Sequence, residues 1–152
     1  FDQSAQIIIS HVPEGVKIAE KALLPKAVIS FIRTHHGRGK AKYFYNSFKN
    51  QYPDKPINDE LFTYPGPNPF SKETAVLMMA DSVEAASRSL KEHTEESISA
   101  LVNKIIDGQI ADGLLKSAPL TFKDVETIKS VFVDKLKTMF HTRISYPDLK
   151  KQ

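Results

Sequence analysis

Four residues of this 152-residue chain have side chains suited to metal or acid–base chemistry and stand where packing alone does not call for them: His11, the adjacent pair His35 and His36, and Asp81. His35 continues an apolar stripe with helical spacing, and His36 is rotated from it by about 100°. Two imidazoles so placed can hold one metal and line its approach. Two structural roles are also compatible with this sequence. His35 could be a hydrogen-bonded residue of the core, or the histidines could be cations that stabilise the C-terminal end of a helix.

Asp81 follows an apolar run, residues 75–80, in what should be the most buried helix of the chain. A carboxylate there is costly unless it is paired or binds a metal. Arg88 lies seven residues further on and returns to nearly the same helix face. Pairing of Arg88 with Asp81 or Glu84 therefore accounts for the carboxylate as well as a metal does.

The composition limits the chemistry. The chain has no cysteine, so disulfides, thiolate nucleophiles and iron–sulfur clusters are excluded, and any metal must be held by nitrogen and oxygen. Its composition, with 41% hydrophobic and 26% charged residues, is typical of a soluble globular domain, and its longest apolar run is far too short to cross a bilayer. A net charge of +3 does not indicate a nucleic-acid partner, although the basic segment 33–55 can attract an anion.

Apolar residues recur at intervals of three and four along nearly the whole chain, which predicts an all-α, bundle-like single domain. We expect helices over about 4–11, 13–23, 25–36, 40–50 and 71–90, followed by two that are capped by Thr94 and Thr121 and a polar tail from about Pro147. Pro13 suits a first helical position, Gly37 a helix end, and Ser71 an N-cap. Five prolines between residues 52 and 70 indicate an ordered loop, and loops of that length are often functional.

Several stretches, taken together, carry a family resemblance. They are residues 8–16 around His11, Arg-Thr-His-His-Gly at 33–37, Tyr-Pro-Gly-Pro at 64–67, residues 79–88 around Asp81, and His-Thr-Arg-Ile-Ser-Tyr-Pro at 141–147. They resemble the catalytic HD domain of seven-transmembrane receptor-type HD phosphohydrolases, the PgpH-type cyclic di-AMP phosphodiesterases. The resemblance spans the chain and implies an HD-domain-like helical bundle. It also implies a cytoplasmic domain of a membrane-anchored bacterial inner-membrane protein, which hydrolyses cyclic di-AMP to pApA.

The resemblance further implies a centre of two divalent metals, iron or manganese. His11, His35 and His36 would bind one metal, and Asp81 would bind the other. The family also uses an earlier histidine and a His-Asp pair, but no His-Asp dipeptide occurs in this sequence. Since the chain also opens on Phe1, we interpret it as the C-terminal part of the HD domain, incomplete at its N-terminus and inactive alone.

The substrate side of the site is less clearly marked. Arg38 and Arg88 are candidates to meet phosphate, and Tyr64 to stack on a base. No role follows for His141 or Arg143. An HD phosphohydrolase for another nucleotide and a non-catalytic helical binding module remain alternatives. Apolar residues such as Ile7, Ile8 and Val28 would have faced missing helices, so we expect the isolated chain to self-associate.

Overall fold

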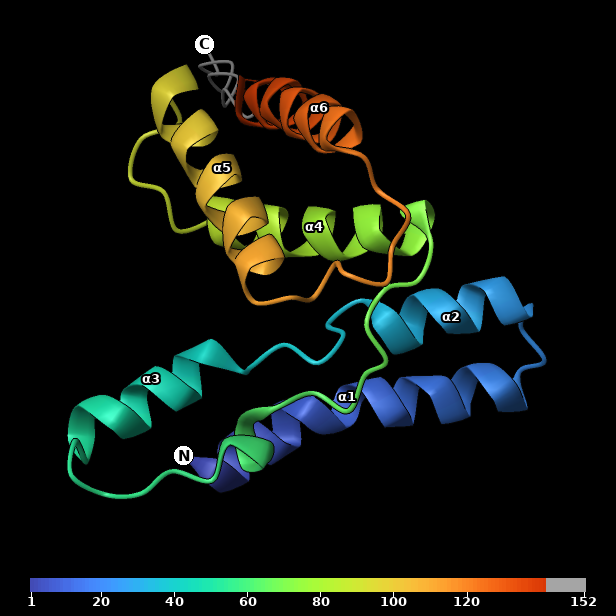
Figure 1. Ribbon diagram of the computed structural model, residues 1–152, viewed down its shortest axis with the longest axis vertical. Coiled ribbons are helices and arrows are strands. Elements are labelled where there is room, and N and C mark those ends of the chain that lie inside the picture. The colour runs from blue at the N-terminus through green and yellow to red at the C-terminus, as the bar shows by residue number, and fades with distance from the viewer. Residues whose placement is uncertain (142–152) are drawn as a thin grey trace, which may run out of the picture.

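The computed structural model describes residues 1–141, and the regular elements in that part of the chain are all helices. Its elements are α1 (Asp2–Lys21), α2 (Lys26–Thr34), α3 (Lys42–Gln51), the 3₁₀ helix η1 (Asp59–Phe62), α4 (Lys72–Ser87), α5 (Glu95–Ala111) and α6 (Phe122–His141), traced in Figure 1. Within the described residues there is no strand, only an isolated bridge between Lys40 and Thr63. The expected all-α fold is therefore confirmed.

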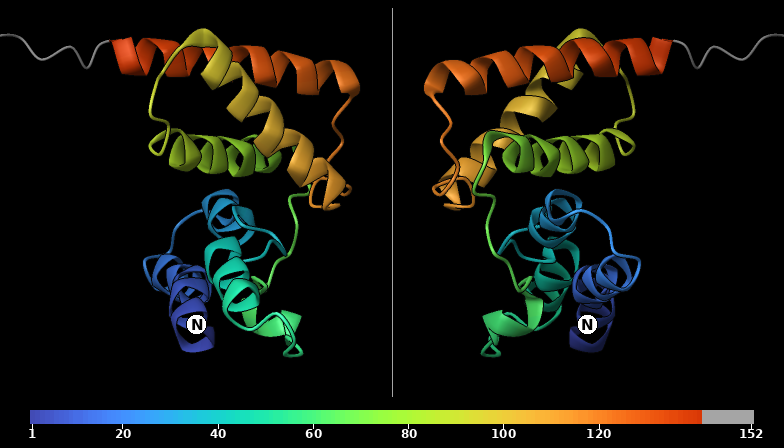
Figure 2. Two further views of the ribbon diagram at one scale, coloured as in Figure 1. Left: turned by 90° about the vertical axis from the view of Figure 1, so that its left-hand side faces the viewer. Right: turned by 90° about the vertical axis from the view of Figure 1, so that its right-hand side faces the viewer.

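The helices form two layers, each with its own apolar cluster. Figure 2 shows α1, α2 and α3 on one side and α4, α5 and α6 on the other. The first layer buries Ile9 and Val12 of α1 against Phe62 of η1, and the second buries residues of α4, α5 and α6 together. The layers meet where α2 packs against α4, and the 63–71 segment joins η1 to α4. The end of α2 and the middle of α4 are thus brought together.

The expected break at Pro13 is wrong, because α1 runs without interruption from Asp2 to Lys21. A proline costs a helix one backbone hydrogen bond. The buried stripe of Ile9, Val12 and Val16 nevertheless continues across Pro13, so the packing of a single long helix outweighs that loss. The proline-rich loop also holds a short element that the sequence did not indicate, η1.

The three expected N-caps are present. The Ser71 hydroxyl accepts from the Thr74 N–H at 3.1 Å, and the Thr94 hydroxyl accepts from the Ser97 N–H at 3.1 Å. Thr121 and Asp124 cap α6 reciprocally through their side chains and backbone N–H groups. These caps satisfy N–H groups that the first helical turn leaves without a partner.

Large apolar side chains remain exposed on α1, on α2 and in the turn between them. Ile7 is 72% exposed and Leu23 is 89% exposed, and Ile8, Ile18 and Val28 are exposed as well. No helix within residues 1–141 is both long enough and apolar enough to span a bilayer.

Candidate metal centre and its cleft

The structure brings together the three histidines that the sequence singled out. His11 comes from the middle of α1, while His35 and His36 follow the last turn of α2. One ring nitrogen from each lies within 4.8 Å of the corresponding nitrogens of the other two, and the three form a group able to hold a metal ion.

Hydrogen bonds to the backbone set the tautomers of His11 and His35. The Nδ1 of His11 lies 2.5 Å from the Ile8 carbonyl oxygen, and the Nδ1 of His35 lies 2.6 Å from the Ile32 carbonyl oxygen. A carbonyl only accepts, so each Nδ1 carries the proton and donates it, which leaves each Nε2 with a free lone pair. The two Nε2 atoms are 3.1 Å apart. Two lone pairs that face each other at this distance repel unless a proton or a metal cation lies between them.

His36 completes the group as a neutral imidazole. Burial, and then the neighbouring rings of His35 and His11, lower its pKa to about 4. Neutral imidazole is the form that binds metals. Its Nδ1 lies 3.9 Å from Oδ2 of Asp81, across the junction between the two layers.

The turn after α2 is what aims these rings. Gly37 has a φ of +51°, and a Cβ there would lie 2.6 Å from Asn68 Oδ1 and 2.7 Å from Met78 Cε, so the position favours glycine. The next residue is tied to the proline-rich loop, because the Arg38 N–H donates to Asn68 Oδ1 at 2.8 Å. That loop also places Tyr64, whose ring stacks on His36 with 4.3 Å between centroids.

Asp81 is placed differently from the sequence expectation. We expected it to be buried, in the middle of the most buried helix of the chain, but its side chain is 45% exposed. The core face of α4 is formed by Ala75, Met78, Met79 and Val83, and Asp81 lies off that face. It therefore reaches the edge of the histidine group without the desolvation cost that the apolar run suggested.

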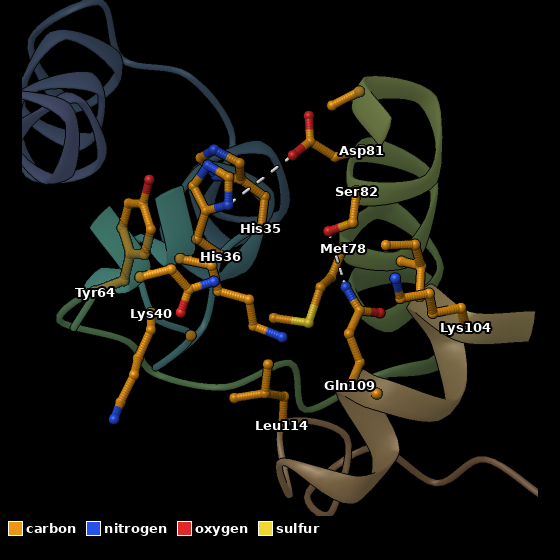
Figure 3. A pocket seen from close by; sticks show the side chains of 16 residues that line it. His35, His36, Lys40, Tyr64, Met78, Asp81, Ser82, Lys104, Gln109 and Leu114 are labelled. Carbon is orange, nitrogen blue, oxygen red and sulfur yellow. Dashed lines mark hydrogen bonds and ion pairs between the residues drawn. The ribbon is translucent and has the colours of Figure 1, made fainter. Parts of the chain in front are cut away.

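A cleft of about 530 Å³ lies beside the histidines, and Figure 3 shows its walls. His35, His36 and Tyr64 line one wall, and Asp81 and Ser82 of α4 line the other together with Lys104 and Gln109 of α5. We call this the central cleft. A volume of this order suits a small-molecule ligand.

Three lysines line the cleft, and one of them makes it favourable for an anion. Lys40 and Lys42 have carboxylate partners, Asp59 at 2.5 Å and Asp112 at 3.2 Å. Lys104 lines the cleft and forms no ion pair with any residue of the described range 1–141. A phosphate group bound next to the histidines would find this ammonium group available.

The three residues that we expected to contact the substrate differ in their exposure and in their distance from the central cleft. Tyr64 is only 6% exposed and one face of its ring lies on His36, so it supports the histidine and has little surface for a base. Arg38 lines a second cavity that borders the central cleft, with its guanidinium 3.7 Å from Glu60. Arg88 donates to both carboxylate oxygens of Glu84, at 2.9 and 2.5 Å, which is the intrahelical pairing that the sequence left open.

The remaining histidines lie elsewhere. His93 stacks on Phe140, and both line a separate surface pocket together with His141. Arg143 lies outside the described residues.

Sequence reasoning missed Asn68, Lys104 and Gln109. Asn68 had a local signal, since an asparagine between prolines indicates a turn. Lys104 and Gln109 have no local signal, because only the packing of α5 against α4 brings them to the cleft.

Comparisons with known proteins agree with this geometry, although no family model matches the chain. The chain is 40% identical over 149 residues to the cyclic-di-AMP phosphodiesterase PgpH of Bacillus subtilis, and the match covers 98% of the chain and 21% of that protein. It is 35% identical over 149 residues to PgpH of Listeria monocytogenes, covering 98% of the chain and 20% of that protein. The chain therefore spans about a fifth of the length of these curated relatives.

A solved structure is similar over nearly the whole chain. The HD domain of the Listeria monocytogenes phosphodiesterase PgpH in complex with cyclic-di-AMP matches with a TM-score of 0.87 and 34% identity. The match covers 95% of this chain and 67% of that one.

Proposed function

This chain belongs to the family of PgpH HD domains, and on that premise we propose that it forms the histidine-bearing part of a metal-dependent active site that hydrolyses cyclic di-AMP to linear pApA. The observation that carries the proposal is the 3.1 Å approach of the Nε2 atoms of His11 and His35, each with its Nδ1 proton donated to a backbone carbonyl. Such a pair of acceptors fits a bound cation.

Membership of an HD-domain phosphodiesterase family implies a divalent metal in general. We assign His11, His35 and His36 to one metal and Asp81 to a second, and imidazole with carboxylate suits iron or manganese. Bound metals of this kind supply an activated water and stabilise charge at phosphorus. The residues present fit that role, since one ring nitrogen from each of three histidines converges and a carboxylate lies 3.9 Å from one of them.

The residues of this chain hold and surround the reacting groups. Backbone carbonyls fix the rings of His11 and His35, and Tyr64 holds the ring of His36. Lys104 attracts the phosphodiester into the central cleft. Addition of water at one phosphorus breaks one ester bond to a ribose 3′ oxygen, which leaves with a proton as a hydroxyl and opens the ring to pApA.

We further propose that residues 1–152 are the C-terminal portion of a single HD domain whose other ligands come from an N-terminal portion. The solved PgpH HD domain is longer than this chain, which covers 67% of it, and that supports the proposal. We also propose that the parent protein is anchored in the bacterial inner membrane and that this domain lies in the cytoplasm. The exposed Ile7, Ile8 and Val28 support self-association of the chain when it is isolated.

Metal analysis of the dialysed chain tests the assignment of the histidines. We expect about one metal per chain, lost in His35→Ala and retained in Asp81→Ala. His93→Ala is the matched control, because His93 lies outside the group. Equal metal content in His35→Ala and His93→Ala would contradict the assignment. Hydrolysis of cyclic di-AMP by the isolated chain would contradict the proposal that it is inactive alone.

A further inference from the structure

A buried carboxamide forms part of the cleft wall opposite the histidines. Gln109 of α5 is 8% exposed, and its Nε2 donates to Oγ of Ser82 on α4 at 2.8 Å. Its Oε1 is buried and has no hydrogen-bond partner among the residues that the structure describes. Figure 3 shows the amide beside Ser82, across the cleft from His36.

Packing does not account for a glutamine at this place. Its neighbours along the wall include Met78, Ile105 and Leu114, so an apolar side chain of similar size would fit there. A buried acceptor without a partner destabilises the fold, whereas an apolar group in the same place does not. The unpaired oxygen is therefore better explained by a ligand that completes the hydrogen bonds of the amide.

The free groups of the amide define the chemistry of that ligand. The Oε1 accepts, and the second N–H of Nε2, which the bond to Ser82 does not use, donates. Adenine carries the matching pair on one edge, with the N6 amino group as donor and N7 as acceptor. Guanine has two acceptors on that edge, O6 and N7, and one of them would face the amide oxygen.

The side chain can present this pair to a base. Water does not reach the Oε1, so the side chain must change its rotamer to bring the Oε1 and one N–H of Nε2 together to the cleft. The Ser82 hydroxyl both donates and accepts, so it can hold either end of the amide. The cleft of about 530 Å³ that Gln109 shares with His35 and His36 is of a size that accommodates a nucleotide.

We propose that Gln109 selects adenine as the base of the bound nucleotide and that Ser82 is the positioning residue for its amide. The inference rests on the proposed function and deepens it, because it names the group that distinguishes adenine from guanine.

Three substrates of the intact gene product test it: cyclic di-AMP, cyclic di-GMP and bis(p-nitrophenyl) phosphate, a phosphodiester without a base. In Gln109→Met, which keeps the size and removes the polar groups, we expect kcat/KM for cyclic di-AMP to fall by about tenfold or more. The value for cyclic di-GMP should rise, because the amide oxygen that would face a guanine acceptor is gone, and the value for bis(p-nitrophenyl) phosphate should stay unchanged. Ser82→Ala should lower the preference for adenine in the same direction by a smaller factor.

Each remaining outcome has a distinct meaning. An equal fall on all three substrates would show a structural role, and an unchanged preference for adenine would remove the proposal. If the wild-type protein cleaves bis(p-nitrophenyl) phosphate and neither cyclic dinucleotide, the proposed function fails and this inference fails with it. Ser82→Ala provides a second answer if Gln109→Met does not fold, because unchanged discrimination in that variant contradicts the positioning role.

Discussion

His11 lies in α1 and His35 directly follows α2, 24 residues further along the sequence, yet their Nε2 atoms lie 3.1 Å from each other. Both rings have their Nδ1 protons committed to carbonyl oxygens one helical turn earlier, so neither ring can turn its donor toward the other without losing that bond. The pair is held in an arrangement that a cation stabilises. This arrangement predicts a difference between the metal-free and the metal-bound chain.

The first prediction concerns His35→Gln. A glutamine amide can place an N–H near the position of Nε2 and donate it to His11, which removes the repulsion between two acceptors. In the metal-free chain we expect the free energy of unfolding to change by no more than about 1 kcal/mol, because relief of the repulsion offsets the loss of the hydrogen bond from His35 Nδ1 to the Ile32 carbonyl, which contributes about that much. Metal at about 100 times its dissociation constant should stabilise the wild type by about 2.7 kcal/mol and the variant hardly at all. Urea denaturation with and without metal checks both values, and a large loss in the metal-free variant would contradict the repulsion.

The second prediction concerns the turn that aims the histidine pair. Gly37→Ala puts a Cβ against Asn68 and Met78 at a positive φ, and we expect a loss of about 1–3 kcal/mol. Gly108→Ala is the matched control, since Gly108 lies inside α5 and its Cβ would meet nothing within 4 Å. That change should stabilise the fold by about 0.5–1 kcal/mol. Chemical denaturation of both variants measures the contrast, and a Gly37→Ala variant as stable as the wild type would show that the turn tolerates a side chain.

Helix content and caps could be predicted from the sequence because they depend on near neighbours. Ser71 and Thr94 cap their helices as their residue types indicate, and Gly37 ends the turn after α2. The exposure of Asp81 could not be predicted, because a continuous apolar run in a helix does not show which face is buried. The wall formed by Ser82 and Gln109 joins residues 27 apart, and only tertiary packing brings them together.

The third prediction concerns acid stability. The Thr121 backbone N–H and then the Lys72 ammonium group lower the pKa of Asp124 to about 2, below its ordinary value of 3.8. A carboxyl whose pKa is depressed by folding stabilises the protein above its unfolded pKa and loses this contribution as pH falls from about 4 to 2. Asp124→Asn should therefore be less stable than the wild type at pH 6, and the difference should shrink toward pH 2. Denaturation midpoints across this range measure it, with Asp54→Asn as the control of equal charge change; a constant difference would refute the linkage.

The last prediction concerns the cation of the central cleft that has no carboxylate partner within residues 1–141. Lys104→Met keeps the length and apolar stem of the side chain and removes its charge. A unit charge about 4 Å from a phosphate in a water-exposed site contributes about 1 kcal/mol, so we expect KM for cyclic di-AMP to rise about fivefold in the intact gene product, with kcat little changed. Added salt screens exposed charges, so the difference from wild type should narrow at about 1 M salt. Lys91→Met is the control, because Lys91 is exposed and lies away from the cleft walls. If Lys91→Met raises KM as much as Lys104→Met does, the effect belongs to the net charge of the domain, and Lys104 has no specific place beside the phosphate.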